Sequence, residues 1–214
     1  AQQLAELRRR GRLSPADCVE VIGLQAVIEA VQPGVLIGTS TRAGAFDQEV
    51  VESLCRGVER PIVLPLSNPT QLAEVTPENL MRWSGGRALV ATGSPFDPVI
   101  VNGCERVIGQ CNNCFVFPGL GFAAMAVGAR EVSEAMIDAS IVALVDGIPA
   151  SRDPDAPLMP SLRDVRPVSA AVAEAVAAAA VQEGIALRAP SQADVSQQLD
   201  SARWWPFYRP VVPA

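Results

Sequence analysis

The sequence predicts an α/β fold in which half of a doubly wound parallel sheet is followed by a C-terminal helical extension. Three short segments, Val35–Gly38, Pro61–Leu66 and Ala88–Ala91, are apolar throughout. Segments of helix length separate them, and strands without polar alternation are typical of a parallel sheet covered on both faces. From Gly119 onward small residues and alanine prevail, and alanine has the highest helix propensity. The pattern therefore predicts a β-α-β-α-β unit with helices after it.

Capping residues mark the helices expected in the first half of the chain. These helices span Gln2–Arg10, Pro15–Val31, Asp47–Gly57 and Pro77–Trp83. Ser14 precedes a proline at the first helical position, which is a favoured helix start. Asp47 and Thr76 are the capping residues expected for the third and fourth helices.

The second half of the chain is expected to be helical after a stretch rich in loops. The prolines and glycines of Ser94–Asn113 predict loops, with one short hairpin among them. Expected next are a long helix, a linker, a second helix ended by Gly184, a last helix and an extended tail. Their ranges are Gly119–Val145, Gly147–Pro160, Val168–Glu183, Ser191–Ser201 and the residues after Ser201.

Composition excludes several kinds of chemistry from this chain. Among 214 residues there are 17 basic side chains, all arginine, with no histidine and a single tyrosine, Tyr208. A Schiff-base lysine, a Ser-His-Asp triad or an imidazole-ligated metal cannot be built from these residues. The net charge of -6 argues against nucleic-acid binding.

Hydropathy and cysteine content point to a protein of the cytoplasm. The chain is 49% hydrophobic, which is ample for a core. No run approaches the roughly 20 apolar residues that a membrane span needs. The N-terminal residues lack the apolar stretch of a signal peptide. An odd number of scattered cysteines is typical of reduced thiols, so we expect no disulfide framework.

Small polar residues follow each of the three predicted strands. Thr39, Ser40 and Thr41 follow the first, Ser67-Asn68 the second, and Thr92-Gly93-Ser94 the third. An open parallel sheet binds ligands beyond the carboxyl ends of its strands. Hydroxyl, amide and backbone groups at that edge suit a nucleotide or a small anion. The alternative is that these residues are the ordinary caps and turns of strand-to-helix loops.

Asparagines stand at two positions suited to ligand contacts. Asn68 precedes a proline, which disfavours a helical backbone, and its neutral amide offers two donors and an acceptor. Asn112 and Asn113 lie just before the predicted helix at Gly119, whose N-terminus favours an anion. The alternative for Asn68 is an Asx turn or a helix cap.

Four other features carry weaker functional signals. Cys111 and Cys114 have the spacing of half a zinc site, but a second pair and histidine are missing. Gly119-Leu120-Gly121 lacks the third glycine of a dinucleotide fingerprint. The arginines at Arg8–Arg10 are interpreted as a solvated helix end. Residues 204–208, which include two tryptophans, are expected to dock onto the same domain or a neighbouring subunit.

Four sequence blocks together resemble the malic enzymes. They read IGTSTRAGAFDQEVV, LSNPTQLAEVTPENLMRW, ALVATGSPFDPV and IGQCNNCFVFPGLGFAA, in the order and spacing of that family. The resemblance runs from about Val27 to Tyr208. It implies oxidative decarboxylation of malate to pyruvate with a nicotinamide cofactor, NAD or NADP, and a divalent metal, Mg or Mn.

The resemblance also implies roles for individual residues. Asn68 matches a residue that contacts cofactor and substrate, and Asn112 and Asn113 match a pair that holds malate. Thr39, Ser40, Thr41 and Ser94 match positions that line the cofactor. The family's catalytic tyrosine, general-base lysine, acidic metal ligands and pyrophosphate-binding glycines lie on a preceding N-terminal half. We therefore expect no catalytic or metal-binding residue in this chain, and a structural role for Tyr208.

The resemblance implies a division of the chain into three parts. Residues 1–113 would be the C-terminal portion of a Rossmann-like NAD(P)-binding domain, 114–187 helices that pack on the preceding half, and 188–214 a tail at a subunit contact of a dimer or tetramer. Two alternatives remain open. One is malolactic activity, which converts malate to lactate, and the other is a stand-alone, non-catalytic dinucleotide-binding module.

Overall fold

The structure, a computed structural model, describes residues 9, 23–189 and 191–205. The chain folds into two compact units. Among the described residues, the first contains those up to Asn112 together with Ile148–Ser161, and the second contains Asn113–Gly147 and those from Leu162 onward. The predicted helix at Gln2–Arg10 lies outside the described residues except for Arg9, which is helical. Tyr208 also lies outside them.

A parallel sheet of four strands forms the centre of the first unit, in the order β1-β2-β3-β6. The strands are β1 (Val35–Gly38), β2 (Ile62–Pro65), β3 (Leu89–Thr92) and β6 (Gly109–Gln110). Their parallel pairing confirms the predicted fold class. The strand β6 was not predicted, because two residues that include a glycine give no strand pattern. The expected hairpin is confirmed as β4 (Val99–Val101) and β5 (Cys104–Arg106).

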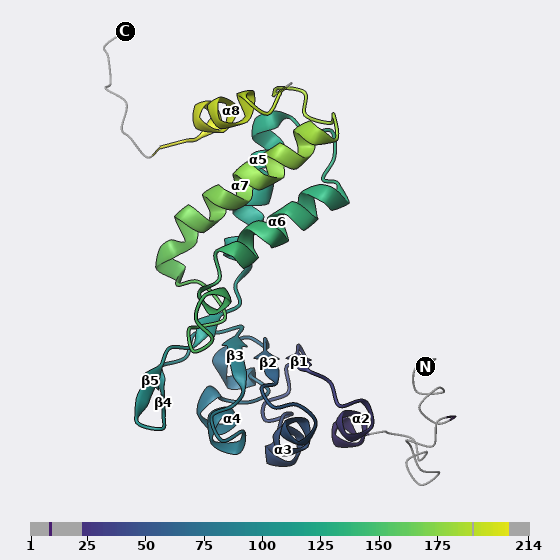
Figure 1. Cartoon of the computed structure of the whole chain (residues 1–214), viewed down its shortest axis with the longest axis vertical. Helices are drawn as coiled ribbons and strands as arrows, with labels where there is room; N and C mark the ends of the chain where they lie inside the picture. Colours follow the sequence, from purple (N-terminus) through teal and green to yellow (C-terminus); the bar gives the residue numbers. More distant parts are fainter. Residues whose placement is uncertain (1–8, 10–22, 190, 206–214) are drawn as a thin grey trace. The chain divides into compact units, whose positions relative to one another are not determined.

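Three helices cover one face of this sheet (Figure 1). They are α2 (Leu24–Val31), α3 (Gln48–Gly57) and α4 (Pro77–Trp83). Their buried side chains form one core with alternate residues of the strands, including Leu36, Val63 and Val90. The predicted caps are present, since Asp47 accepts a hydrogen bond from the Val50 nitrogen at 3.0 Å, and Thr76 caps α4 in the same way.

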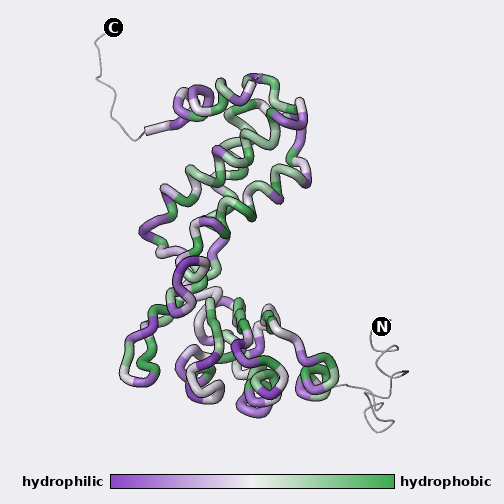
Figure 2. Tube along the Cα trace, viewed as in Figure 1, coloured by the Kyte–Doolittle hydropathy of each residue, from purple (hydrophilic) through white to green (hydrophobic). Residues whose placement is uncertain are grey.

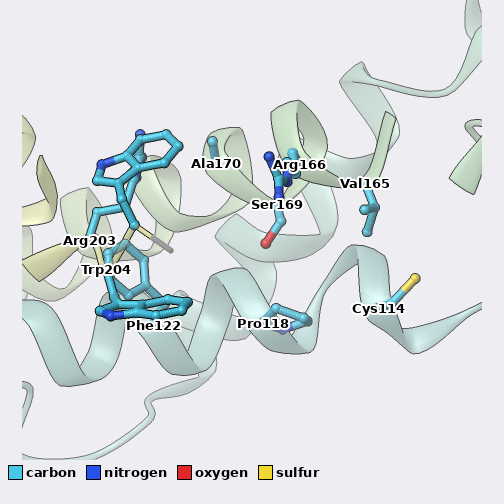
Figure 3. Close-up of a pocket in the computed structure, with 10 residues that line it drawn as sticks. Cys114, Pro118, Phe122, Val165, Arg166, Ser169, Ala170, Arg203 and Trp204 are labelled. Carbon is cyan, nitrogen blue, oxygen red and sulfur yellow. The ribbon is translucent and has the colours of Figure 1, made fainter. Parts of the chain in front are cut away.

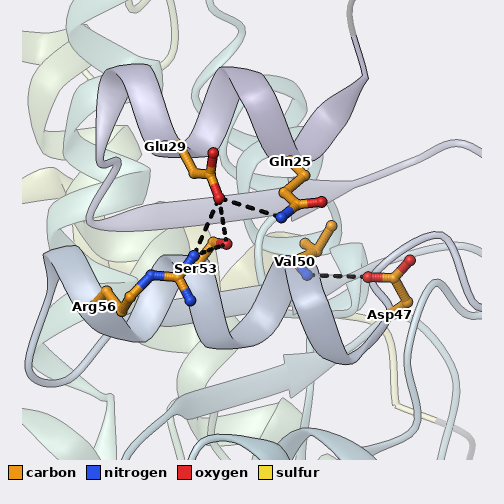
Figure 4. Close-up of polar contacts among 6 residues, drawn as sticks. All are labelled: Gln25, Glu29, Asp47, Val50, Ser53 and Arg56. Atoms are coloured by element: carbon orange, nitrogen blue, oxygen red, sulfur yellow. Dashed lines mark hydrogen bonds and ion pairs between the residues drawn. The ribbon is translucent and has the colours of Figure 1, made fainter.

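The helix predicted over Pro15–Val31 is described from Gly23 onward, since residues 15–22 lie outside the described residues. Gly23 has an extended backbone at the N-cap position, so a continuous helix over Pro15–Val31 is wrong at this residue. Glycine favours such a break because it loses more conformational freedom than other residues when a helix fixes its backbone. Polar side chains join α2 to α3: Glu29 accepts hydrogen bonds from Ser53 and Arg56 of α3 (Figure 4).

The expectation that both faces of the sheet are covered is wrong for β1. Leu36 is buried, whereas the side chains of Val35 and Ile37 on the opposite face are 46% and 57% exposed. The reason is that α2, α3 and α4 all lie on the same face, and the described residues supply nothing that buries these two side chains.

Four helices build the second unit, and hydrophobic residues run along them (Figure 2). They are α5 (Phe117–Val127), α6 (Glu134–Asp146), α7 (Val165–Gln182) and α8 (Asp194–Ala202). Both α5 and α6 pack against α7, around a core of alanines and valines. A Cβ on Gly119 would lie 2.5 Å from the backbone carbonyl oxygen of Ser169, so glycine permits the close approach of α5 and α7.

The single helix expected over Gly119–Val145 is two helices. Gly128 adopts the left-handed conformation (φ 63°) that ends α5, and Ser133 caps α6 by accepting a hydrogen bond from the Met136 nitrogen. The helices predicted near Val168–Glu183 and Ser191–Ser201 are confirmed as α7 and α8. None of the helices in the described ranges is both long and apolar enough to span a membrane.

Candidate functional site

The carboxyl ends of the four parallel strands lie along one edge of the sheet. The register pairs Gly38 with Pro65 and Thr92 with Gln110, so the strands end at a similar level. The residues that follow them are therefore neighbours along this edge. They are Thr39–Thr41 after β1, Ser67-Asn68 after β2, Gly93-Ser94 after β3 and Cys111-Asn112 after β6.

Hydrogen bonds join the ends of β2, β3 and β6. The buried Ser94 hydroxyl donates to the Asn68 Oδ1 at 2.9 Å. The Gln110 side chain, from β6, donates to the Gly93 carbonyl at 3.1 Å. A Cβ on Gly93 would lie 2.1 Å from the Leu66 oxygen, which shows how closely these two chain segments approach. The Asn68 side chain is exposed and is held by its oxygen, so its Nδ2 hydrogens remain for a ligand.

A buried carboxylate, Glu74, joins the end of β1 to the end of β2. Its Oε1 accepts hydrogen bonds from the Ser40 nitrogen at 2.7 Å, the Ser40 hydroxyl at 2.8 Å and the Ser67 hydroxyl at 2.5 Å. Its Oε2 accepts a longer one, 3.4 Å, from the Ser67 nitrogen. A Cβ on Gly38 would clash with the Glu74 side chain, so glycine makes room for it.

The sequence did not single out Glu74 as a functional residue. The sequence did contain a signal, because Glu74 lies between two apolar residues, Ala73 and Val75. The structure buries both of them. A carboxylate is almost never fully buried unless it has partners. An acidic residue in such a setting was therefore a candidate for a buried hydrogen-bond acceptor.

Hydrogen bonding keeps the Glu74 carboxylate charged. Burial alone would raise the pKa of this carboxyl, but the bonds from Ser67 and Ser40 outweigh burial and lower the pKa below its usual value. Within the described residues no arginine forms an ion pair with it. Neutral N–H and O–H donors therefore compensate the negative charge.

Thr41 has an unusual backbone conformation beside this carboxylate. Its φ of 55° lies in the left-handed region, which β-branched residues rarely adopt. Its nitrogen donates to the Ser67 hydroxyl at 2.8 Å, and that hydroxyl donates in turn to Glu74. The two bonds form a relay that holds the strained residue, and its side chain remains exposed.

The structure divides the asparagine pair between the two units. Asn112 is half-buried and follows β6 at the carboxyl edge of the sheet, in the first unit. Asn113 is exposed and begins the short 3-10 helix Asn113–Phe115 that leads to α5. Of the predicted site residues, the sheet edge thus brings Thr39, Ser40, Thr41, Asn68, Ser94 and Asn112 together.

The cysteines near the asparagine pair have no visible role in this arrangement. Cys111 is a free thiol, and burial raises its pKa. A raised pKa disfavours the thiolate that redox chemistry and metal binding both require. In the part of the chain that the structure describes, no three His, Cys, Asp or Glu side chains are grouped to hold a metal ion.

The second unit contains an apolar cavity of about 520 Å³, and Cys114 is one of the residues that line it. Pro118 and Phe122 of α5 face residues of α7 across it, and Trp204 and Trp205 complete its wall (Figure 3). Trp204 is 80% exposed, so the predicted docking of this aromatic segment onto its own unit is incomplete in the described residues.

A parallel sheet with polar residues along its carboxyl edge is typical of dinucleotide-binding α/β proteins. Comparison with known proteins narrows this class. The profile of the family described as "Malic enzyme, NAD binding domain" matches residues 2–181, and the chain belongs to this family. The match confirms the resemblance seen in the four sequence blocks.

Individual relatives agree with this assignment. The chain is 41% identical over 211 residues to "NAD-dependent malic enzyme 3" of Bacillus subtilis, which covers 99% of this chain and 36% of the relative. It is 45% identical over 188 residues to "NAD-dependent malic enzyme" of a Shewanella species, covering 88% of this chain and 33% of that one. The chain thus spans about a third of these relatives.

A solved structure shows the same fold. The crystal structure of malic enzyme from Pyrococcus horikoshii Ot3 superposes with a TM-score of 0.62 at 28% identity. The superposition covers 84% of this chain and 36% of that chain. In both kinds of comparison the matched region is a fraction of a longer protein.

Proposed function

We propose that this chain is the C-terminal part of an NAD-dependent malic enzyme, which oxidatively decarboxylates (S)-malate to pyruvate and CO2. The observation that carries the proposal is the polar edge of the sheet in a member of this family, where Asn68 is fixed by Ser94. The relatives named NAD-dependent malic enzyme support NAD as the cofactor, and NADP is the alternative.

In this proposal the residues of the sheet edge position the cofactor and the substrate. Asn68 donates through its Nδ2 to the substrate or to the nicotinamide carboxamide, because its oxygen is engaged by Ser94. Thr39, Ser40, Thr41 and Ser94 line the cofactor. Asn112 and Asn113 hold malate by neutral hydrogen bonds. When bound, the nicotinamide accepts the hydride that leaves C2 of malate.

Proton transfer and metal binding are assigned to the rest of the enzyme. The chain has no lysine, and the described residues present no cluster suited to Mg or Mn. The contribution of this chain is orientation, which raises reaction rates by holding the reacting groups in alignment. We therefore expect the isolated chain to be inactive.

Exposed apolar surfaces support a missing partner. Ile37 is exposed on the uncovered face of the edge strand β1, where a doubly wound sheet would continue. In the second unit, α6 exposes four large apolar side chains, Ile137, Ile141, Val142 and Val145. Surfaces of this kind mark interaction sites. The proposed partners are the N-terminal half of the enzyme and, for the helical part 114–187 and the tail 188–214, a further subunit.

The reaction is tested by product analysis with the complete enzyme. Supplied with malate, NAD and Mn, it is expected to form pyruvate and NADH in equal amounts. Lactate without net NADH would instead assign malolactic activity. If the enzyme formed neither product from malate, it would belong to the family without sharing the activity of malic enzymes.

The stand-alone alternative is tested with the chain itself. Calorimetric titration with NAD is expected to give no binding heat, because the pyrophosphate-binding residues lie outside the chain in this proposal. Saturable binding by a monodisperse chain would favour an independent dinucleotide-binding module.

A further inference from the structure

Glu74 has no assigned role, yet it is the only carboxylate fully buried among the described residues. Burying a charge without compensation is strongly unfavourable, and replacement by an apolar residue is often tolerated better. Here two loops are shaped to supply the compensation. Three of the four donors to Glu74 point at one oxygen, and they come from positions 40 and 67, in the loops that follow β1 and β2.

We propose that Glu74 is a positioning residue for the dinucleotide: it holds the loop at Ser40-Thr41 against the loop at Ser67-Asn68. This inference rests on the proposed function. Glu74 is fully buried and so cannot touch the cofactor itself. It acts through residues that are exposed at the sheet edge, Ser40, Thr41 and Asn68.

The relay through Ser67 explains how the effect reaches the ligand. Glu74 accepts the Ser67 hydrogen, which leaves the Ser67 oxygen lone pairs to accept from the Thr41 nitrogen. Without the carboxylate the Ser67 hydroxyl is free to rotate. Thr41 then loses the contact that maintains its left-handed backbone, and the loop relaxes away from the geometry that the cofactor requires.

The substitution Glu74→Gln tests the proposal in the complete enzyme. The amide keeps the shape of the side chain but removes the charge and directs an N–H toward either Ser67 or Ser40. We expect the KM for NAD to rise about tenfold while kcat changes by less than about threefold, because groups of the reacting centre are not removed. The matched control is Glu59→Gln, an exposed glutamate, which is expected to leave both constants unchanged.

A second variant guards against a folding defect in Glu74→Gln. Ser67→Ala removes a buried hydroxyl that cannot reach the ligand, and it leaves the carboxylate with its Ser40 donors. It should raise the KM for NAD about threefold. In the double variant the two effects should not add, because both changes interrupt the same relay.

The outcomes separate the two proposals. If the wild-type enzyme shows no NAD-dependent oxidation of malate, the proposed function fails before any variant is compared. If the wild type is active and both variants lower the melting temperature but keep the KM for NAD within about twofold of wild type, Glu74 is only structural and the inference is overturned.

Discussion

The Ser94 hydroxyl lies 2.9 Å from the Asn68 Oδ1 and donates to it. Ser94 is buried and follows β3, whereas Asn68 is exposed and follows β2. The bond crosses between neighbouring strands and determines which end of the Asn68 amide is left for a ligand. The bond thus links the loop after β2 to the loop after β3, and it leaves the Asn68 Nδ2 as the hydrogen-bond donor for a ligand.

Replacing Asn68 should weaken catalysis more than replacing Ser94. We expect Asn68→Ala to lower kcat/KM for malate by on the order of 100-fold in the complete enzyme, because a positioning group is lost. Ser94→Ala should lower it about tenfold, because the amide stays but is free to turn. Steady-state kinetics measures both. Asn79→Ala, which removes an amide on α4, is the control and should be neutral.

Acid should remove the stabilisation that Glu74 provides. Its pKa is lowered in the folded chain relative to about 4.3 when unfolded, so its contribution is complete above that value and is lost as pH falls through the lower folded pKa. Urea unfolding should therefore show wild type more stable than Glu74→Gln at pH 7, by a margin that shrinks below about pH 4. A margin independent of pH would contradict this, with Glu59→Gln as reference.

Two glycines of α5 should respond oppositely to alanine. Gly119→Ala places a Cβ 2.5 Å from the Ser169 oxygen and should destabilise the chain by about 1–3 kcal/mol. Gly121→Ala meets no atom within 4 Å and should stabilise by about 0.5–1 kcal/mol, the helix-propensity difference. Thermal unfolding followed by circular dichroism compares them. Equal effects would mean that α5 and α7 are not this close.

A matched pair of valines tests the uncovered face of β1. Val63→Thr buries a hydroxyl in the core and should cost about 1–3 kcal/mol. Val35→Thr changes an exposed side chain and should stay within about 0.5 kcal/mol in this chain. In the complete enzyme we expect Val35→Thr to become costly, since the missing half would cover it. Chemical denaturation of each variant, made in this chain and in the complete enzyme, measures these changes in stability.

The strands and most helices could be predicted because their signals are local. Val35–Gly38 was predicted with its observed bounds, since a wholly apolar run between turns leaves few alternatives. The helix at Pro77–Trp83 was likewise predicted from Thr76 and the following proline. Local capping chemistry decides such boundaries.

The sequence-based predictions failed where the structure depends on a contact distant in the sequence, or where a single residue ends an element. Gly128 looked like one more small residue of a long helix, but its left-handed backbone ends α5. The strand β6 exists only because Gly109 and Gln110 pair with β3. Glu74 was overlooked because its partners at Ser40 are 34 positions away. The exposure of Val35 and Ile37 was missed because a wholly apolar run does not indicate on which face of the sheet the helices lie.

The claim that this chain orients ligands while the rest of the enzyme performs the chemistry has one direct test. Malate-dependent formation of NADH is measured for the purified chain and for the complete enzyme, with NAD and Mn present in both. The account predicts turnover by the complete enzyme and none by the chain alone. Sustained NADH formation by the chain alone would contradict it, because the proton-transferring groups would then have to lie among these 214 residues.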